Sequence, residues 1–457
     1  MINTSTSDEN LCGLKRADFQ TTVNGKQTDL FILKNENGAE IAVTNYGGAV
    51  LAIMVPDKNG KYANVIQGHD SITHVINSHE PFLSTLIGRY GNRIAGGKFI
   101  LEGKEYSLTI NNGPNSLHGG PTGFHTRIWD AEQETPQSLK LHYLSADGEE
   151  GFPGNLDIHV TYTLSNQNEF IITYHATTDK TTLVNLTHHG FFSLSGIANP
   201  TATVDNNIVT INADFYTPID NVSIPTGEIA KVEGTPMDFR TPQRVDSRIN
   251  DPFEQLKFGA GYDHCYVLNK REAGTLSFAA KCVEPESGRS MEVYTTEPGV
   301  QVYTSNWHNG FEGAHGATFP ARSAICFEAQ HFPDTYKNSF VKYVPVRSNL
   351  NIAVQSSYRH FSGAHFTNLS ALHTHQKCSI FIDFQSHAFI RADLIQNADR
   401  LALICQQHVI IIQHHGKIAG LDKFLIIDFK FLHNKPDQTV SVVCFSRFQV
   451  QRGRFVF

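Results

Sequence analysis

The 457-residue sequence has no closely spaced cysteine pair and no long apolar run. Its seven cysteines are scattered without a CxxC pair, which argues against a zinc cage or a disulfide framework and suits a reducing compartment. No run of about 18 apolar residues exists, so we expect no membrane-spanning helix. The first residues, Met1 to Asn10, are polar and acidic and lack the apolar segment of a secretory signal. We therefore expect a cytoplasmic protein.

An excess of basic charge is also missing. The formal net charge is −7, which gives no sequence-wide basic footprint for nucleic acid. Hydrophobic residues make up 40% and charged residues 18% of the chain, which is typical of a folded globular protein and not of a disordered one. The composition thus gives no indication of a nucleic-acid partner, and it leaves the oligomeric state open.

Helical patterns are absent from most of the chain. Before about residue 345 we find no amphipathic pattern of about 12 residues or more. Strand patterns are frequent instead, and the clearest one has apolar residues at every second position: Leu156, Ile158, Val160, Tyr162 and Leu164. Short strands of this kind alternate with Asn- and Gly-containing turns such as Asn37-Gly38. The pattern predicts an all-β fold, an antiparallel sandwich or barrel.

Glutamate disappears near the C-terminus. Residues 346–457 contain no Glu, Met or Trp, and their 12 Lys and Arg against 6 Asp give a charge of +6, against −13 for the remainder. The change is concentrated beyond about Ser362. We therefore divide the chain into an N-terminal lead (1–18), a main domain (19–361) and an unassigned tail (362–457).

Three interpretations of the tail stay open. It is a small second domain with candidate strands at 379–382 and 409–412, a natural extension, or a frame-shifted or fused translation product. Two histidine clusters in the tail, His373/His375 and His414/His415, suggest metal binding. Without Glu or a close Cys pair nearby, incidental histidines are the better interpretation, and we assign the tail no function.

Six short motifs before the tail combine turn residues with polar side chains. They are Gly-Asn-Arg-Ile (91–94), Asn-Ser-Leu-His-Gly-Gly (115–120), Asn-Leu-Thr-His-His (185–189), Gly-Tyr-Asp-His (261–264), Gly-Val-Gln-Val-Tyr-Thr (299–304) and Phe-Glu-Ala-Gln-His-Phe-Pro-Asp (327–334). His188 and His189 are neighbours and point to opposite faces if they lie on a strand, so one of them faces a given cleft. Glu328 has apolar neighbours, which raise a carboxyl pKa and suit a general base. Each residue taken alone also has a structural interpretation, such as an ion pair, a turn cap or a core histidine.

Taken together, the motifs occur in the order and approximate spacing of a known family. From about Phe19 to Phe361 the chain resembles the aldose 1-epimerases, the galactose mutarotases. The resemblance implies a large antiparallel β-sandwich of the galactose mutarotase type. It also implies that acid–base ring opening interconverts the α and β anomers of a hexose such as galactose or glucose, with no metal or other cofactor.

The resemblance also implies roles for individual residues. His189 corresponds to the general acid and Glu328 to the general base. The implied sugar-hydroxyl ligands are Asn92, Arg93, His118, Asp263 and Gln301. His118 is also expected to assist at the ring oxygen.

The chain departs from the family pattern at two places. His188-His189-Gly190-Phe191-Phe192 stands where the family usually has Asn-His-Ser-Tyr-Phe, so the acid is kept and its neighbours differ. The closing turn and strand are also altered, at 347–349 and 358–361, and an unpaired closing strand would leave a sheet edge open.

Other functions remain as alternatives. A non-catalytic sugar-binding protein is one of them. A glycoside hydrolase would need Glu328 and Asp263 as a carboxyl pair about 5–9.5 Å apart. A sugar-phosphate epimerase would need a further Lys/Arg cluster, which the sequence does not show.

Overall fold

The computed structural model describes residues 10–199, 201, 203–334, 352–361, 400–405, 408–414, 424–430 and 439–445, with side chains described only up to residue 334. The chain divides into two compact units. One comprises Met1–Ala364 with Phe455–Phe457, and the other comprises His365–Arg454. The six motifs all lie in the first unit.

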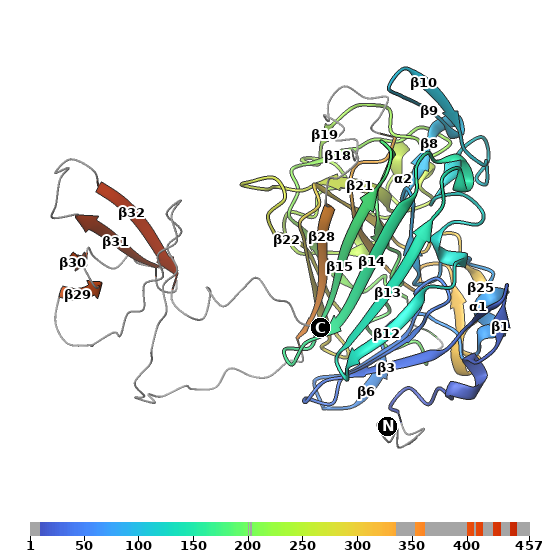
Figure 1. Ribbon diagram of the computed structural model, residues 1–457, viewed down its shortest axis with the longest axis horizontal. Coiled ribbons are helices and arrows are strands. Elements are labelled where there is room, and N and C mark those ends of the chain that lie inside the picture. The colour runs from blue at the N-terminus through green and yellow to red at the C-terminus, as the bar shows by residue number, and fades with distance from the viewer. Residues whose placement is uncertain are drawn as a thin grey trace. The chain divides into compact units, whose positions relative to one another are not determined.

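A nine-stranded antiparallel sheet dominates the first unit (Figure 1). In spatial order its strands are β12 (Asp130–Thr135), β13 (Ser138–Ser145), β14 (Leu156–Leu164), β15 (Glu169–Thr178), β28 (Ile352–Phe361), β23 (Ser290–Thr295), β22 (Ser277–Val283), β17 (Ile208–Ile211) and β20 (Gln243–Arg244). The altered closing strand is β28, and it pairs on both sides, with β15 and with β23. It therefore leaves no open edge, while the altered turn at 347–349 lies outside the described residues.

Two smaller antiparallel sheets accompany the large one. The five-stranded sheet has the order β19 (Ala230–Lys231), β18 (Phe215–Thr217), β21 (Asp263–Val267), β24 (Gly299–Tyr303) and β27 (Cys326–Gln330). The N-terminal sheet has the order β3 (Leu30–Lys34), β4 (Glu40–Thr44), β5 (Val50–Pro56) and β6 (Tyr62–Asn64). The two-stranded pairs are β1 (Thr22–Val23) with β2 (Lys26–Gln27), β7 (Leu86–Ile87) with β16 (Thr187–His188), β8 (Arg93–Ile94) with β11 (Ser116–Leu117), β9 (Lys98–Leu101) with β10 (Lys104–Ser107), and β25 (Asn309–Glu312) with β26 (Thr318–Pro320).

The hydrophobic core lies between these sheets. Strand β14 alternates between buried and more exposed residues along its whole length, as its sequence predicts. Val160 of β14, Ile41 of β4 and Phe327 of β27 belong to one buried cluster, so the inner faces of the three sheets share a core. The expected all-β sandwich is confirmed.

Every residue of β24 and β27 is buried, so both faces of these strands are covered, and this includes the polar side chains of Gln301 and Glu328. Val300 and Val302 of β24 join the core, whereas the residue between them, Gln301, points to the other face. Polar residues on that second face are therefore buried without belonging to the hydrophobic core.

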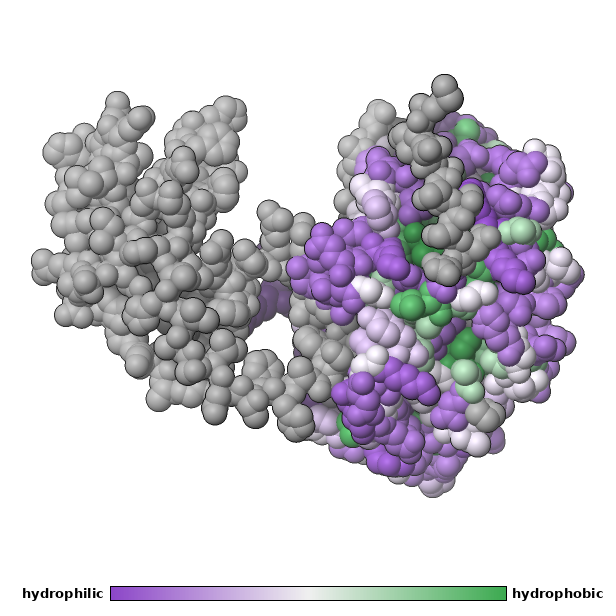
Figure 2. Space-filling view, turned by 90° about the horizontal axis from the view of Figure 1, so that it is seen from below, coloured by the Kyte–Doolittle hydropathy of each residue, from purple (hydrophilic) through white to green (hydrophobic). Residues whose placement is uncertain are grey.

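Helices are few and short. Within the described residues the α-helices are α1 (Ile72–Ile76) and α2 (Glu254–Phe258), five residues each, so the predicted lack of long helices before residue 345 holds there. None of the helices in this part of the chain is long and apolar enough to cross a membrane. The face shown in Figure 2 is largely hydrophilic, with small apolar patches.

The second unit contains one antiparallel sheet in its described part. The strand order is β29 (Arg400–Cys405), β30 (His408–His414), β31 (Phe424–Lys430) and β32 (Thr439–Phe445). The candidate strand at 409–412 falls within β30, while the one at 379–382 lies outside the described residues, as do His373, His375 and His415. The three interpretations of 362–457, a frame-shifted or fused product among them, stay predictions.

Candidate active site

Three neighbouring strands of the five-stranded sheet carry Asp263, Gln301 and Glu328. Gln301 of β24 lies directly opposite Glu328 of β27 in the strand register. The Gln301 Nε2 donates a hydrogen bond of 2.7 Å to the Asp263 Oδ1 on β21. All three side chains are buried, so the sheet presents a row of polar groups that face away from solvent.

His189 meets this row from a separate segment, directly after β16. Its Nε2 lies 3.5 Å from the Glu328 Oε1, and the two side chains are only 7% and 2% exposed. The backbone N–H of His189 donates to the carbonyl of Thr85, and its ring stacks on Phe191 at 4.6 Å between centroids. The imidazole is thus held against the carboxyl by its backbone and by packing.

His188 lies on the opposite side of the same segment, as strand geometry predicts. Its ring makes edge contacts with Tyr162 and Phe170, both of which belong to the hydrophobic core. His188 therefore packs behind the site, and His189 is the histidine that reaches Glu328.

The second motif adds His118. Its ring centroid lies 5.1 Å from that of His189, and its Nδ1 accepts a hydrogen bond of 3.0 Å from the backbone N–H of Asn92. A neutral imidazole that accepts at Nδ1 carries its proton on Nε2, so His118 is a hydrogen-bond donor at Nε2. Asn92 and His118 have positive φ angles of 63° and 54°, a backbone conformation that residues other than Gly seldom adopt.

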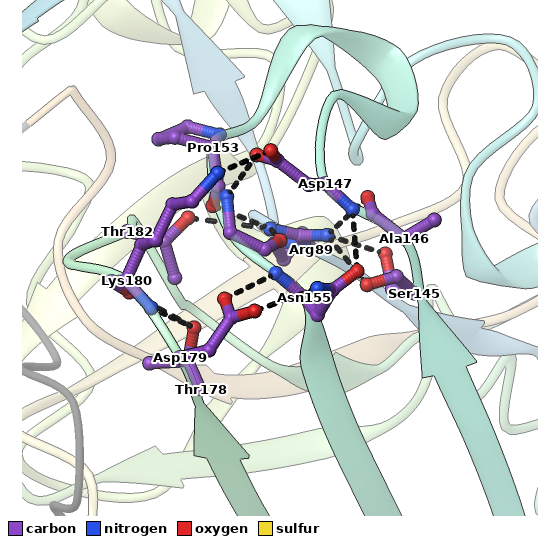
Figure 3. A network of polar contacts seen from close by, with 11 residues as sticks. Arg89, Ser145, Ala146, Asp147, Pro153, Asn155, Thr178, Asp179, Lys180 and Thr182 are labelled. Atoms are coloured by element: carbon purple, nitrogen blue, oxygen red, sulfur yellow. Dashed lines mark hydrogen bonds and ion pairs between the residues drawn. The ribbon is translucent and has the colours of Figure 1, made fainter.

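Arg89 anchors the segment that leads to Asn92 and to β8, and Figure 3 shows the polar contacts around Arg89. The buried Arg89 guanidinium donates to the carbonyls of Pro153, Gly154, Ser145 and Ala146 and to the hydroxyls of Ser145 and Thr182. Burial lowers the pKa of Arg89 to about 10, and the nearby Glu149 opposes that shift. Arg89 is therefore a structural anchor, for which the sequence offers no clear signal.

Asn185 ties three of the motifs together. Its Nδ2 donates to the carbonyls of Gly91 and His331, and its Oδ1 accepts from the backbone N–H of His331. Asp334 adds a further link, since its Oδ1 accepts from the backbone N–H of Ala95. Segments far apart in the sequence are thus held around one site by hydrogen bonds that are buried or partly buried.

Burial is the largest cause of the pKa shifts in the site. It raises the pKa of Glu328 well above its usual value, Asp263 raises it further, and Arg93 opposes the shift. It also raises the pKa of Asp263, against Arg93 and the Gln301 amide. It lowers the pKa of His189 to about 3 and that of His118 well below the usual value. Burial therefore opposes a charge on Glu328 and on His189 alike, and it favours the neutral carboxyl beside the neutral imidazole.

Several buried polar atoms in the site lack a hydrogen-bond partner among the described residues. They include the Glu328 Oε2, the Gln301 Oε1 and the His189 Nδ1. Buried polar groups are rarely left unpaired, so a cluster of them indicates a site for a polar ligand. The same region has donors for a cation, because ligand atoms of His118, His189 and Glu328 lie within 4.8 Å of one another.

Comparison with known proteins identifies the family. The family model described as aldose 1-epimerase matches residues 29–346. This chain belongs to the aldose 1-epimerase family. The galactose mutarotase of Mus musculus is 39% identical over 312 residues, which are 68% of this chain and 87% of the relative. The aldose 1-epimerase of Escherichia coli (strain K12) is 32% identical over 68% of this chain and 88% of its own length.

Solved structures of similar proteins agree with the family. The aldose epimerase homologue from C. elegans matches with a TM-score of 0.67 at 26% identity, over 73% of this chain and 99% of that one. The galactose 1-epimerase from Lactobacillus acidophilus NCFM matches with a TM-score of 0.65 at 25% identity, over 75% and 97%. The predicted family and its galactose mutarotase-like fold are confirmed.

Within this epimerase fold the sequence-based site residues come together, and aromatic rings complete their surroundings. Phe82 contacts the rings of both His118 and His125 at 4.6 Å between centroids, and Tyr303 makes an edge contact with His189. Sequence reasoning gave no role to Phe82. Tyr303 belongs to the motif at 299–304. It lies two residues after Gln301 and therefore on the same face of β24, and this spacing could have indicated its place beside the site.

Proposed function

We propose that this protein interconverts the α and β anomers of a hexose such as galactose or glucose, with His189 as general acid and Glu328 as general base. The observation that carries the proposal is the buried His189–Glu328 pair, with 3.5 Å between Nε2 and Oε1. An imidazole and a carboxyl that share one proton can remove a proton from one oxygen and deliver a proton to another.

Burial favours the proton on Glu328 in the free protein, so the reactive form, a Glu328 carboxylate with a His189 imidazolium, requires that this proton first passes from Glu328 to His189. Glu328 takes the proton of the anomeric O1 hydroxyl while His189 gives its proton to the ring oxygen O5, and the C1–O5 bond breaks to give the open-chain aldehyde. Rotation about C1–C2 presents the other face of C1, and closure with the proton transfers reversed yields the other anomer. Each positioned acid or base contributes about 10²–10⁴-fold to such a reaction.

The sugar-binding roles are part of the same proposal. Asn92, Arg93, Asp263 and Gln301 bind the hydroxyl groups, so that the rest of the sugar stays in place while C1 rotates. His118 donates from its Nε2, either to a hydroxyl or to the ring oxygen, because its Nδ1 is already an acceptor for Asn92.

The hydrolase alternative fits the contacts less well. Glu328 contacts His189, whereas the Asp263 carboxylate is hydrogen-bonded by Gln301. A hydrolase needs two carboxyl groups that act on either side of one bond. An acid–base pair of one carboxyl and one imidazole suits proton exchange at two oxygens of the same sugar.

Galactose is favoured as the substrate by the relatives named galactose mutarotase, and a monosaccharide is the proposed partner. We keep the cytoplasm as the predicted compartment. We further propose that residues 19–361 form the catalytic domain, and that the lead 1–18 and the tail 362–457 contribute no group to the site.

Polarimetry on freshly dissolved α-galactose and α-glucose tests the function. The protein should bring the optical rotation to its equilibrium value faster than buffer does, and a rate equal to that of buffer contradicts the proposal. Methyl α-galactoside separates the alternatives. It has no O1 proton, so an epimerase leaves its rotation unchanged, whereas a hydrolase changes it.

A further inference from the structure

A second cluster of histidine and carboxylate groups lies on the outer face of the nine-stranded sheet, whereas Asp263, Gln301 and Glu328 lie on the five-stranded sheet. His142 is on β13, and Asp157 and His159 are on β14, which lie side by side in Figure 1. His142 and His159 are directly opposite each other in the register. Asp157 precedes His159 by two residues and therefore shares its face of the sheet.

The three side chains converge on one point. The Asp157 Oδ1 lies 2.7 Å from the His142 Nε2 and 3.6 Å from the His159 Nε2, and ligand atoms of all three lie within 4.8 Å of one another. The two imidazole rings stack with their centroids 4.4 Å apart and their planes at 19°. Both rings thus direct Nε2 toward the same carboxylate oxygen.

We propose that His142, Asp157 and His159 form a surface site for a divalent transition-metal ion of the zinc class. Zinc binds histidine nitrogen and carboxylate oxygen at about 2.0–2.2 Å, so two ligand atoms of a tetrahedral site lie about 3.3 Å apart. The observed separations of 2.7 and 3.6 Å lie on either side of that value. The ion replaces the proton of the His142–Asp157 hydrogen bond, and the nearly parallel rings turn so that both Nε2 lone pairs face the ion. Two histidines, one carboxylate and one water complete four-coordination.

The surroundings favour a cation. Two neutral imidazoles and one carboxylate carry a charge of −1, and a second carboxylate lies close by, with Asp130 Oδ2 3.9 Å from the His142 Nδ1. At that distance Asp130 accepts no hydrogen bond from the ring, but its negative charge adds to the attraction for a cation. The nearby Lys140 is paired with Glu134, and Lys26 is paired with Asp130, so neither contacts Asp157 in the described residues.

The site is open to solvent. The side chains of His142, Asp157 and His159 are 38%, 45% and 51% exposed, so an ion reaches them without a change in the fold. Because the ligands come from two paired strands and their backbone positions are set by the ladder, the site is preorganised by the sheet. It does not involve the sugar site, so the catalytic residues are intact in variants of it.

Equilibrium dialysis of the full chain against Zn²⁺ tests the proposal. The variants are His142→Gln and His159→Gln, and the matched control is His74→Gln. The control removes an exposed histidine whose Nδ1 lies 2.8 Å from Asp70 but which has no third ligand in the described residues. Other histidines of the chain are the same in all variants and contribute equally.

We expect the wild type and His74→Gln to bind one Zn²⁺ more than His142→Gln or His159→Gln at low metal concentration. The affinity of this site for Zn²⁺ should fall at least about tenfold in either variant. Removing a group that only hydrogen-bonds to a metal ligand already costs about 10–100-fold in affinity, and these variants remove a ligand itself. All four proteins should keep the same rate of anomer relaxation, which shows that they are folded. Equal Zn²⁺ stoichiometry and affinity in the wild type and in His159→Gln would overturn the proposal.

Discussion

Replacing Glu328 by Gln separates the chemistry of the proposed base from its packing. The two side chains have the same number of heavy atoms, and Glu328 is 2% exposed in the middle of a strand paired with β24. An amide fills the same space and keeps the ladder intact, but it cannot accept a proton from a sugar hydroxyl. The Glu328→Gln change therefore removes the base and leaves the fold.

The size of the effect follows from the role of the pair. Loss of one positioned acid or base costs about 10²–10⁴-fold in rate, which corresponds to about 3–5 kcal/mol in the activation barrier. Among the residues that the structure describes, His189 is the only one that makes an ion-pair contact with Glu328, at 3.5 Å. No second carboxylate there takes the place of the one that the variant removes. We expect a fall of that size in kcat/KM on α-galactose, measured by polarimetry.

A matched control separates the loss of this carboxyl from the general effect of a Glu→Gln change. Glu312→Gln removes a carboxylate from an exposed position on β25 and should leave the rate unchanged. Thermal unfolding of Glu328→Gln should occur close to that of the wild type, because the amide replaces a carboxyl that burial already drives toward its neutral form. A folded Glu328→Gln variant that retains more than about one tenth of the wild-type kcat/KM refutes the role of Glu328.

Three further predictions concern the proton count and the anchors of the site. Activity should have a bell-shaped pH dependence, because the His189–Glu328 pair needs one proton. Activity is lost at low pH when a second proton binds, below the usual histidine pKa because burial lowers the pKa of His189, and at high pH when the last proton leaves, above the usual carboxyl pKa because burial raises the pKa of Glu328. A rate that is flat from pH 3 to 10, a range of about seven units, would contradict this prediction. Asn185→Ala removes three hydrogen bonds that join the motifs, one of them buried and two partly buried. A shift of about 1 Å in the site can cost about 10²-fold, so kcat/KM should fall strongly for α-galactose and α-glucose alike. An unchanged rate would show that the link is dispensable. Arg89→Lys leaves several of the carbonyls around the guanidinium without a donor and should lower the free energy of unfolding by about 2–4 kcal/mol in urea titrations, whereas unchanged stability would refute the anchor.

Much of the fold could be predicted because its signals are local. Strand β14 has its buried residues at every second position, and the turns near Asn37-Gly38 and Glu102-Gly103 separate strands as their sequences indicate. The order of the strands in the large sheet could not be predicted in the same way. The pairing of β28 with β15 and β23 joins segments more than 50 residues apart, and no local pattern encodes such a register.

The same distinction holds for the site. The proposed pair of His189 and Glu328 was predicted from motifs whose roles the family resemblance implies, and the structure brings the two side chains within 3.5 Å of each other. The anchors were not found, because Arg89 binds mainly backbone carbonyls, which any sequence supplies. Likewise, the two faces of the His188–His189 segment follow from strand geometry. The choice of His189 came from the family resemblance, and the packing of Tyr162 and Phe170 against His188 gives its physical reason.

The central claim is that the protein exchanges the anomers of a free sugar through the His189–Glu328 pair. Magnetisation transfer between the α and β anomeric protons of galactose at equilibrium measures that exchange directly, without a change in composition. The wild type should transfer magnetisation between the two signals at a rate proportional to protein concentration, and His189→Asn should reduce that rate to the level seen in buffer. No transfer above the buffer level with the wild type, or equal transfer with His189→Asn, would contradict the account.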